Sequence, residues 1–372
     1  MRTRGTIRLA TRGSDLALRQ AAAVSEALED RRYDVELVEV ETTGDQLDDE
    51  LIHRLGTTGA FVRSLDERVL DGEVDAAVHS MKDMPTESPE ELIVAGIPAR
   101  AEPGDVLVTP DGLDLDGLPQ GARVGTSSLR RRAQLLAERP DLEVVPLRGN
   151  VDTRVEKLLA PTLHREHERR LEAEEHEDPD DSPFERSVEE WFDGLAEVER
   201  RALERKPEES FDAIVLAAAG LGRLGLDTQV PTSPLPIASF VPSPGQGAIA
   251  VTALDDGDAG EAIHDALDHP RTRVETTVER VVLAELGGGC VAPIGVHAVV
   301  QGEHVRARVR VLSTDGEEEV ATARDLPVRT YAEAAREFAA DLRERGAAEL
   351  IEESVNAADD DGGPQREDDA SG

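Results

Sequence analysis

Short apolar segments alternate with amphipathic segments along most of this chain. Residues 7–11 have the pattern of a strand, and Ser14 follows them as the N-cap of a helix. Residues 35–40 return as a strand, and residues 61–70 have helical spacing. Because this alternation continues through the later segments, it favours an α/β fold.

Two connections divide the chain into domains. Residues 98–103 and the proline-rich residues 231–247 interrupt the alternation, and we interpret both as crossings between domains. A third unit begins near Pro270, and the charged end of the chain has the composition of a disordered segment. The predicted units are residues 1–99 together with 243–265, residues 103–240, residues 268–356, and a disordered acidic tail at 357–372.

The chain carries a large negative charge. It has 41 Lys and Arg residues against 79 Asp and Glu residues, which gives a net charge of −38. Such a charge repels nucleic acid and anionic membranes, so we expect neither as a partner. A disordered acidic protein could carry the same charge, but the regular apolar segments exclude that class. We interpret the composition as that of a salt-adapted protein.

The sequence also predicts a compartment. No segment is long and apolar enough for a membrane span, and the first residues lack the apolar run of a signal peptide. Only one cysteine is present. We therefore expect a cytoplasmic protein, and we expect it to be a monomer.

One acidic segment, residues 161–210, stands apart from the rest. Its first half has little apolar content, and its second half begins with a capping-box pattern from Ser187 to Glu190. The apolar residues that follow predict an amphipathic helix, which must cover some other surface. Packing onto its own domain is the favoured interpretation, and an oligomer contact is the alternative.

Five motifs place cationic side chains where predicted strands end. Each combines arginine or lysine with hydroxyl-bearing residues or glycines, and open α/β sheets bind ligands at strand ends. A single such arginine is most often a surface or ion-pair residue, but five motifs together indicate a site for a polyanion. The motifs are residues 10–14, 78–83, 124–131, 147–154 and 217–223.

Two residues near these motifs carry other chemistry. Asp83 is a carboxylate next to Lys82; it either pairs with a neighbouring arginine or stabilises a developing cation on the ligand. Cys290 is the single cysteine and follows three glycines, so it can form neither an intramolecular disulfide nor a multi-cysteine zinc site. It is either a small buried apolar residue or a nucleophile or covalent anchor. No histidine motif indicates a base that would activate it.

Several motifs, in order along the chain, resemble those of the porphobilinogen deaminase (hydroxymethylbilane synthase) family. The resemblance covers nearly the whole chain except residues 161–210 and the tail. It implies two domains like those of type II periplasmic binding proteins, joined by a hinge, and a smaller C-terminal α/β domain that carries a cofactor loop. The matching motifs are HSMKD at 79–83, GTSSLRR at 125–131, LRGNVDTR at 147–154, GQGA at 245–248 and GGGCVAPIG at 287–295.

The resemblance also implies a transferase reaction. Four porphobilinogen molecules lose ammonia and couple head to tail onto a dipyrromethane cofactor, and hydrolysis releases 1-hydroxymethylbilane, the linear precursor of uroporphyrinogen III. The resemblance implies that this cofactor is attached through a thioether to Cys290. Asp83 resembles the catalytic aspartate, which stabilises the cationic pyrrole intermediates. The alternative is a cytoplasmic binding protein that uses the same two-domain clamp for an anionic solute.

The resemblance assigns further residues to the acetate and propionate side chains of the pyrroles. Phe61 matches the position that stacks on a pyrrole ring, and no metal is implied. Three departures, Thr43, Thr58 and Asp152, each reduce the positive charge of the site. The carboxylate-binding residues that it implies are Arg12, Ser14, Arg54, Ser80, Lys82, Thr126, Ser128, Arg130, Arg131, Arg148, Arg154 and Arg223.

Overall fold

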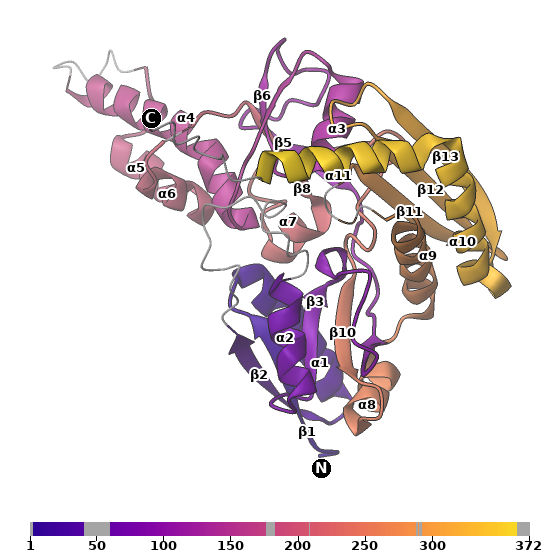
Figure 1. Ribbon diagram of the computed structural model, residues 1–372. Helices are drawn as coiled ribbons and strands as arrows, with labels where there is room; N and C mark the ends of the chain where they lie inside the picture. The colour runs from indigo at the N-terminus through magenta and orange to yellow at the C-terminus, as the bar shows by residue number, and fades with distance from the viewer. Residues whose placement is uncertain are drawn as a thin grey trace, which may run out of the picture.

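The computed structural model of the chain describes residues 3–40, 60–175, 183–207, 209–287, 289 and 292–362. Within this part of the chain, the strands form three separate sheets, each covered by helices (Figure 1). The first sheet lies near the N-terminus at the bottom of the view, the second lies above it, and the third lies to the right.

The first sheet has five strands in the order β2-β1-β3-β10-β4. The first three strands are mutually parallel, while β10, which arrives late in the sequence, is antiparallel to both its neighbours. Ser14 caps α1 as predicted, because its hydroxyl accepts a hydrogen bond from the Ala17 N–H at 3.4 Å. The strands are β1 (Thr6–Arg12), β2 (Asp34–Val40), β3 (Ala76–Ser80), β4 (Leu92–Gly96) and β10 (Ile249–Leu254), and the helices are α1 (Asp15–Asp30), α2 (Ala60–Leu70) and α8 (Asp258–Leu267).

The second sheet repeats this arrangement with the order β7-β6-β8-β5-β9. Three parallel strands are again followed by an antiparallel strand, β5, which enters directly after the chain crosses from the first sheet. Each sheet thus receives one strand from beyond a crossing. The strands are β5 (Asp105–Val108), β6 (Arg123–Gly125), β7 (Glu143–Val145), β8 (Ala213–Ala217) and β9 (Thr232–Pro234), and the helices are α3 (Leu129–Glu138), α4 (Val151–Glu174) and α7 (Ala218–Leu224).

The third sheet is small and wholly antiparallel, with the order β11-β12-β13. Buried side chains of α9, α10 and the sheet, among them Val282, Val309 and Phe338, form a core of its own. Helix α11 ends at Gly362, and the disordered tail placed at 357–372 remains a prediction. The elements are β11 (Ile294–Gln301), β12 (His304–Leu312), β13 (Glu319–Pro327), α9 (Pro270–Leu286), α10 (Tyr331–Leu342), α11 (Ala348–Gly362), and the short turns η4 (Val328–Thr330) and η5 (Arg343–Ala347).

The predicted fold class is confirmed: two matching α/β units are joined by two crossings and followed by a smaller C-terminal α/β unit. The exact domain boundaries remain a prediction.

The acidic segment forms an arm of helices beside the second sheet (Figure 1). Its capping box at Ser187 is present, but the predicted single helix is two helices, α5 (Val188–Asp193) and α6 (Glu197–Glu204), because Glu199 caps a new start at the Ala196 N–H. Val198 and Ala202 are buried in the core of the second unit, Trp191 packs on His167 and Arg170 within the acidic segment, and Phe192 is 41% exposed. The arm therefore packs onto its own domain, as the favoured interpretation predicts.

The two crossings run side by side and require a glycine at residue 247. Gly247 accepts a hydrogen bond from the Ala101 N–H at 3.1 Å and has a φ of +84°. A Cβ atom at this residue would lie 2.6 Å from the Ala101 carbonyl oxygen, which belongs to backbone and cannot move aside easily. The final glycine of the GQGA motif is thus explained by close approach of the crossings.

We predict that Gly247→Ala destabilises the protein by about 2–4 kcal/mol, because backbone strain and a backbone clash add. Gly302→Ala is the matched control, since Gly302 also has a positive φ, +62°, but has open space around its Cβ position. The control should cost about 1 kcal/mol. Denaturant unfolding of both variants measures the difference, and equal losses would show that the close approach is unimportant.

Candidate active site

The predicted catalytic carboxylate lies in a short turn at the end of a buried strand. Asp83 closes the 3-10 turn η2 (Met81–Asp83), directly after β3, and its side chain is exposed. The Met81 N–H donates to the Ala248 carbonyl at 3.1 Å, and the Met84 N–H donates to the Met81 carbonyl at 3.2 Å. Met81 and Met84 are buried. The turn is therefore anchored through its apolar residues while Asp83 faces outward.

Cations of the second unit face this turn. Asp83 acts to raise the pKa of Lys82, but burial and the charges of Arg131 and Arg154 outweigh it, so the pKa of Lys82 lies below its ordinary value. Burial, with the charge of Arg131, lowers the pKa of Arg154 to about 10, and Arg148 adds to this effect while Asp83 opposes it. These mutual influences show that motifs from both sheets meet at one site.

The closeness of Lys82, Arg131 and Arg154 to one another has a chemical consequence. Cations whose pKa values are lowered by burial and by each other are held at a cost in free energy when no counter-ion is present. Arg154 remains charged at neutral pH, because its pKa of about 10 is well above 7. An anionic ligand would relieve the repulsion, so the arrangement favours binding of carboxylates.

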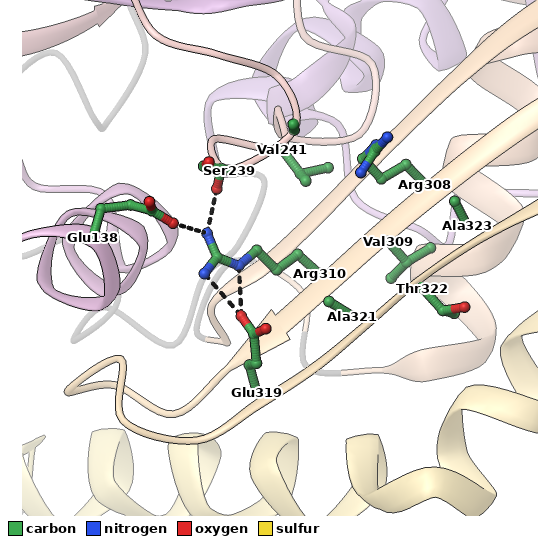
Figure 2. A pocket seen from close by; sticks show the side chains of 11 residues that line it. Glu138, Ser239, Val241, Arg308, Val309, Arg310, Glu319, Ala321, Thr322 and Ala323 are labelled. Carbon is green, nitrogen blue, oxygen red and sulfur yellow. Dashed lines mark hydrogen bonds and ion pairs between the residues drawn. The ribbon is translucent and has the colours of Figure 1, made fainter.

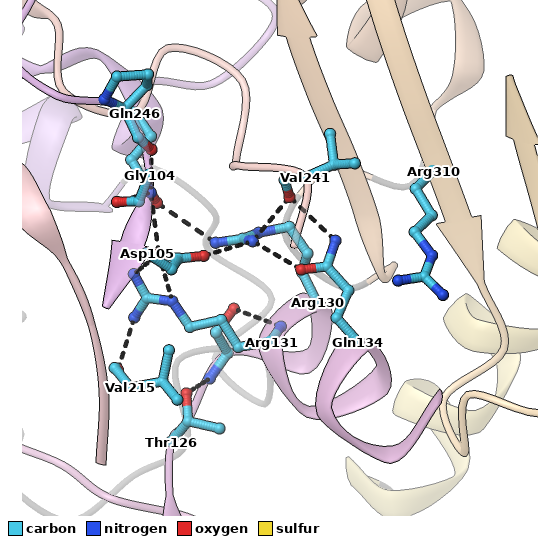
Figure 3. A network of polar contacts seen from close by, with 12 residues as sticks. Gly104, Asp105, Thr126, Arg130, Arg131, Gln134, Val215, Val241, Gln246 and Arg310 are labelled. Carbon is cyan, nitrogen blue, oxygen red and sulfur yellow. Dashed lines mark hydrogen bonds and ion pairs between the residues drawn. The ribbon is translucent and has the colours of Figure 1, made fainter. Parts of the chain in front are cut away.

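Arg130 and Arg131 lie inside the protein, where both contact the carboxylate of Asp105 (Figure 3). Arg130 Nη1 lies 2.8 Å from Asp105 Oδ2, and Arg131 Nη2 lies 2.7 Å from Asp105 Oδ1. Each arginine is 6% exposed and Asp105 is 1% exposed. Burial acts to raise the pKa of Asp105, but the two arginines hold it well below its ordinary value.

Gln246 of the GQGA motif completes this network (Figure 3). Its Nε2 atom donates to Asp105 Oδ1 at 2.9 Å and to the Pro103 carbonyl at 2.6 Å. Arg130 also donates to the Val241 carbonyl at 2.8 Å. The two predicted carboxylate-binding arginines are therefore fixed by the crossings, and their role toward a ligand remains a prediction.

Three predicted hydroxyl donors act as local caps. Thr126 accepts from the Ser128 N–H at 3.2 Å, and Ser128 accepts from the Arg131 N–H at 3.4 Å as the N-cap of α3. Ser14 caps α1 in the same way. Because each hydroxyl is the acceptor in these contacts, its proton can still be donated to an anion.

The remaining described residues of the predicted set lie at the ends of their elements. Arg12 ends β1 and is half-buried, Ser80 ends β3, and Arg148 precedes α4. Arg223 of α7 donates to the Gly247 carbonyl at 2.7 Å, and burial lowers its pKa. Asp152 lies in the first turn of α4, where a carboxylate also stabilises the positive end of the helix dipole.

Several predicted residues cannot be placed. Cys290, Arg54, Thr43 and Thr58 lie outside the described residues. Phe61 lies in the first turn of α2, but its side chain also lies outside the described part.

A buried glutamate that the sequence analysis did not single out joins the third unit to the crossings. Glu279 of α9 pairs with Arg100, with Nη1 and Oε1 2.8 Å apart, and accepts from the Gly245 N–H at 2.7 Å and the Ala298 N–H at 2.8 Å. Burial acts to raise the pKa of Glu279, but Arg100 and His297 lower it below its ordinary value. The only sequence signal was a charged residue on the apolar face of its helix.

The histidine of the HSMKD motif has a structural role. His79 is buried, and its Nε2 atom lies 2.9 Å from Asp66 Oδ1 and 3.0 Å from the Thr252 hydroxyl. Thr252 in turn donates to Asp66 at 2.8 Å. This cluster ties α2 to strands β3 and β10 beneath the turn that carries Asp83.

A separate cavity of about 330 Å³ lies between the second and third units (Figure 2). Arg310 of β12 projects toward its edge and contacts Glu138 at 3.2 Å, Glu319 at 2.9 Å and the Ser239 carbonyl. No described residue of the predicted site lines this cavity. We therefore assign these contacts to docking of the third unit.

Among the described residues, no group of three or more His, Cys, Asp or Glu side chains could hold a metal ion. Likewise, none of the helices in the described ranges is both long and apolar enough to cross a membrane.

The fold and the site together define a class of protein: two similar α/β units with cationic residues of both gathered at one place, and an attached third unit. The chain belongs to the porphobilinogen deaminase family. The family model for the dipyromethane cofactor binding domain of porphobilinogen deaminase matches residues 7–165 and 196–261, and the model for its C-terminal domain matches residues 274–344. The gap between the two parts of the first match, residues 166–195, falls within the acidic segment.

Similar proteins carry the same name. A probable porphobilinogen deaminase of Halobacterium salinarum is 56% identical, over 95% of this chain and 99% of that protein. The porphobilinogen deaminase of Rubrobacter xylanophilus is 41% identical, over 93% of this chain and 97% of that protein. Among solved structures, a nutrient-binding protein of Burkholderia cenocepacia bound to methionine is similar at 13% identity and a TM-score of 0.35. The similarity covers 72% of this chain and 93% of that protein. The assignment rests on the family models and sequence relatives.

Proposed function

We propose that this chain is a transferase that joins four porphobilinogen molecules, with release of ammonia, to give 1-hydroxymethylbilane. The family to which it belongs supports this reaction, because its relatives are named for the deamination of porphobilinogen. The observation that carries the proposal is the exposed carboxylate of Asp83 beside Lys82 and near enough to Arg154 to influence its pKa.

Each part of this arrangement suits one part of the substrate. The pyrrole rings carry acetate and propionate groups, which the arginines and hydroxyls can bind as charge-assisted hydrogen bonds. Asp83 is the carboxylate within reach of a ring N–H, so it stabilises positive charge as it develops on the pyrrole nitrogen. The surrounding cations can bind the carboxylates of the ligand through charge-assisted hydrogen bonds.

We further propose a dipyrromethane cofactor held by a thioether to Cys290. The family model is named for this cofactor, and the cations and capping hydroxyls described above are donors that fit its carboxylates. When bound, the cofactor supplies the free pyrrole carbon to which the next unit is joined. Arg131, Arg154 and Lys82 would hold its side chains, and α9 leads directly into the glycine-rich loop before Cys290.

The cellular setting follows from composition. The charge of −38 supports a cytoplasmic, salt-adapted enzyme whose partners are porphobilinogen and the growing polypyrrole rather than nucleic acid or membranes. We propose that it acts as a monomer. A binding protein for an anionic solute, the alternative, is not favoured by the relatives.

An assay of ammonia release distinguishes these functions. The purified chain, held in molar KCl to screen its charge, is incubated with porphobilinogen, and ammonia and linear tetrapyrrole are measured together. We expect four ammonia molecules for each tetrapyrrole released. Tight binding of porphobilinogen without ammonia release would instead identify a solute-binding protein.

A further inference from the structure

Arg280 of α9 reaches out of the third unit and contacts the backbone that follows the catalytic turn. Its Nη2 atom donates to the Pro85 carbonyl at 2.6 Å, and its Nη1 atom donates to the Met84 carbonyl at 3.3 Å. These two residues follow Asp83 directly. The sequence analysis gave Arg280 no role, and the function proposed above does not use it.

The surroundings of Arg280 are unusual for an arginine. It is half-buried, and burial lowers its pKa, yet no ion pair within the described ranges compensates its charge. The carboxylate of the neighbouring residue, Glu279, binds Arg100 and backbone N–H groups instead of Arg280. A desolvated guanidinium bound only to carbonyls is costly to bury, so stability alone does not account for it.

The same turn is held on its other side by the crossings. The Met81 N–H donates to the Ala248 carbonyl, and a Cβ atom at Gly245 would lie 2.7 Å from Met81. Arg280 therefore supplies the second anchor, after Asp83 rather than before it. The backbone of the turn is therefore held both before and after Asp83.

We propose that Arg280 is a positioning residue that sets Asp83 relative to the helix leading to Cys290. The inference rests on the proposed function. Cys290 is the tenth residue after Arg280, and α9 is continuous from Pro270 to Leu286, so a helix spans most of the chain between them. One arginine thus couples the catalytic turn of the first unit to the cofactor-bearing end of the third.

Helix α9 provides a matched control at Arg273. This residue lies two helical turns earlier and also docks onto the first unit, where its Nη2 atom donates to the Val94 carbonyl at 3.0 Å and the Ala95 carbonyl at 3.1 Å. Those carbonyls belong to β4, away from the turn, and Arg273 pairs with Asp268 as well. Loss of Arg273 removes docking bonds of the same kind without touching the backbone after Asp83.

The test compares Arg280→Gln, Arg280→Lys and Arg273→Gln as cofactor-loaded enzymes in molar KCl. Intact mass first confirms equal loading, and kcat, KM for porphobilinogen and the unfolding midpoint are then measured. We expect Arg280→Gln to lower kcat by about 10- to 100-fold, with KM changed less than about threefold, because the carboxylate is misplaced while the binding cations stay. Arg280→Lys should recover part of the loss, since an ammonium can still donate to one carbonyl.

Arg273→Gln should lower the unfolding midpoint but keep kcat within about threefold of the unmodified enzyme. The inference is overturned if Arg280→Gln keeps normal kcat, or if both glutamine variants lose kcat in proportion to stability. If Arg280→Gln fails to fold, Arg280→Lys carries the test, and an unchanged kcat in that variant would count against the inference. The unmodified chain, assayed beside the variants, reports separately on the proposed function.

Discussion

Asp83→Asn is expected to lower the rate of ammonia release by about 100- to 1,000-fold while the protein stays folded. The substitution keeps the size of the side chain and removes its negative charge. Asp83 is exposed, and the turn is anchored through Met81 and Met84, so the backbone should not change. What is lost is the carboxylate that we propose stabilises cationic pyrroles beside Lys82 and Arg154.

The matched control is Asp71→Asn, which removes an exposed carboxylate on the same domain after α2. It should leave the rate unchanged. Steady-state assays and circular dichroism of both variants check the expectation. Near-normal ammonia release by Asp83→Asn would remove this residue from the mechanism.

Asp105→Asn is expected to destabilise the protein by about 3–5 kcal/mol, the largest loss of stability that we predict. Asp105 is the shared counter-ion of Arg130 and Arg131, and all three side chains are buried. Asparagine matches its volume but leaves two buried cations without a negative charge. Unfolding by guanidinium chloride measures the loss.

Asp141→Asn is the control for this variant. Asp141 pairs with Arg139 in the same domain, at 2.7 Å, but the two side chains are 27% and 19% exposed, so solvent screens this pair more than the buried one. Its loss should therefore be far smaller. Similar losses for the two variants would show that burial of the Asp105 network is unimportant.

Comparison of the unmodified protein with Asp105→Asn also predicts how the free energy of unfolding depends on pH. The arginines hold the pKa of Asp105 below its ordinary value in the folded state, despite the opposing effect of burial. Its stabilisation is therefore fully present above about pH 4, its pKa in the unfolded chain, and is lost as the pH falls toward the folded value. The difference in stability between unmodified protein and Asp105→Asn should shrink below about pH 4.

Local patterns were sufficient to predict most of the elements in the first half of each unit. The Ser14 cap and helix α9 follow from side-chain chemistry and spacing within a few residues. Residues 243–265 were predicted to join the first unit, but the antiparallel pairing of β10 with both β3 and β4, across more than 150 residues, was not predicted. Such pairing depends on the crossings and leaves no local signal.

The sequence predicted the cationic residues of the candidate site, but it did not predict the residues that hold them in place. Arg131 and Arg154 were identified through motifs, and both lie close enough to Lys82, the neighbour of Asp83, to lower its pKa. Asp105 was missed, because a single acid at the start of an apolar strand resembles a surface residue until both arginines fold over it. Arg280 was missed for a similar reason: its partners are carbonyls, which every sequence contains.

Intact-mass spectrometry of the purified chain and of Cys290→Ala tests the central claim most directly. The account predicts that the unmodified protein is heavier than its sequence by two porphobilinogen units less two ammonia, and that brief exposure to substrate adds further pyrrole units in steps. Cys290→Ala should have the mass of its sequence and form no tetrapyrrole. An active protein whose mass equals that of the bare sequence would contradict the account.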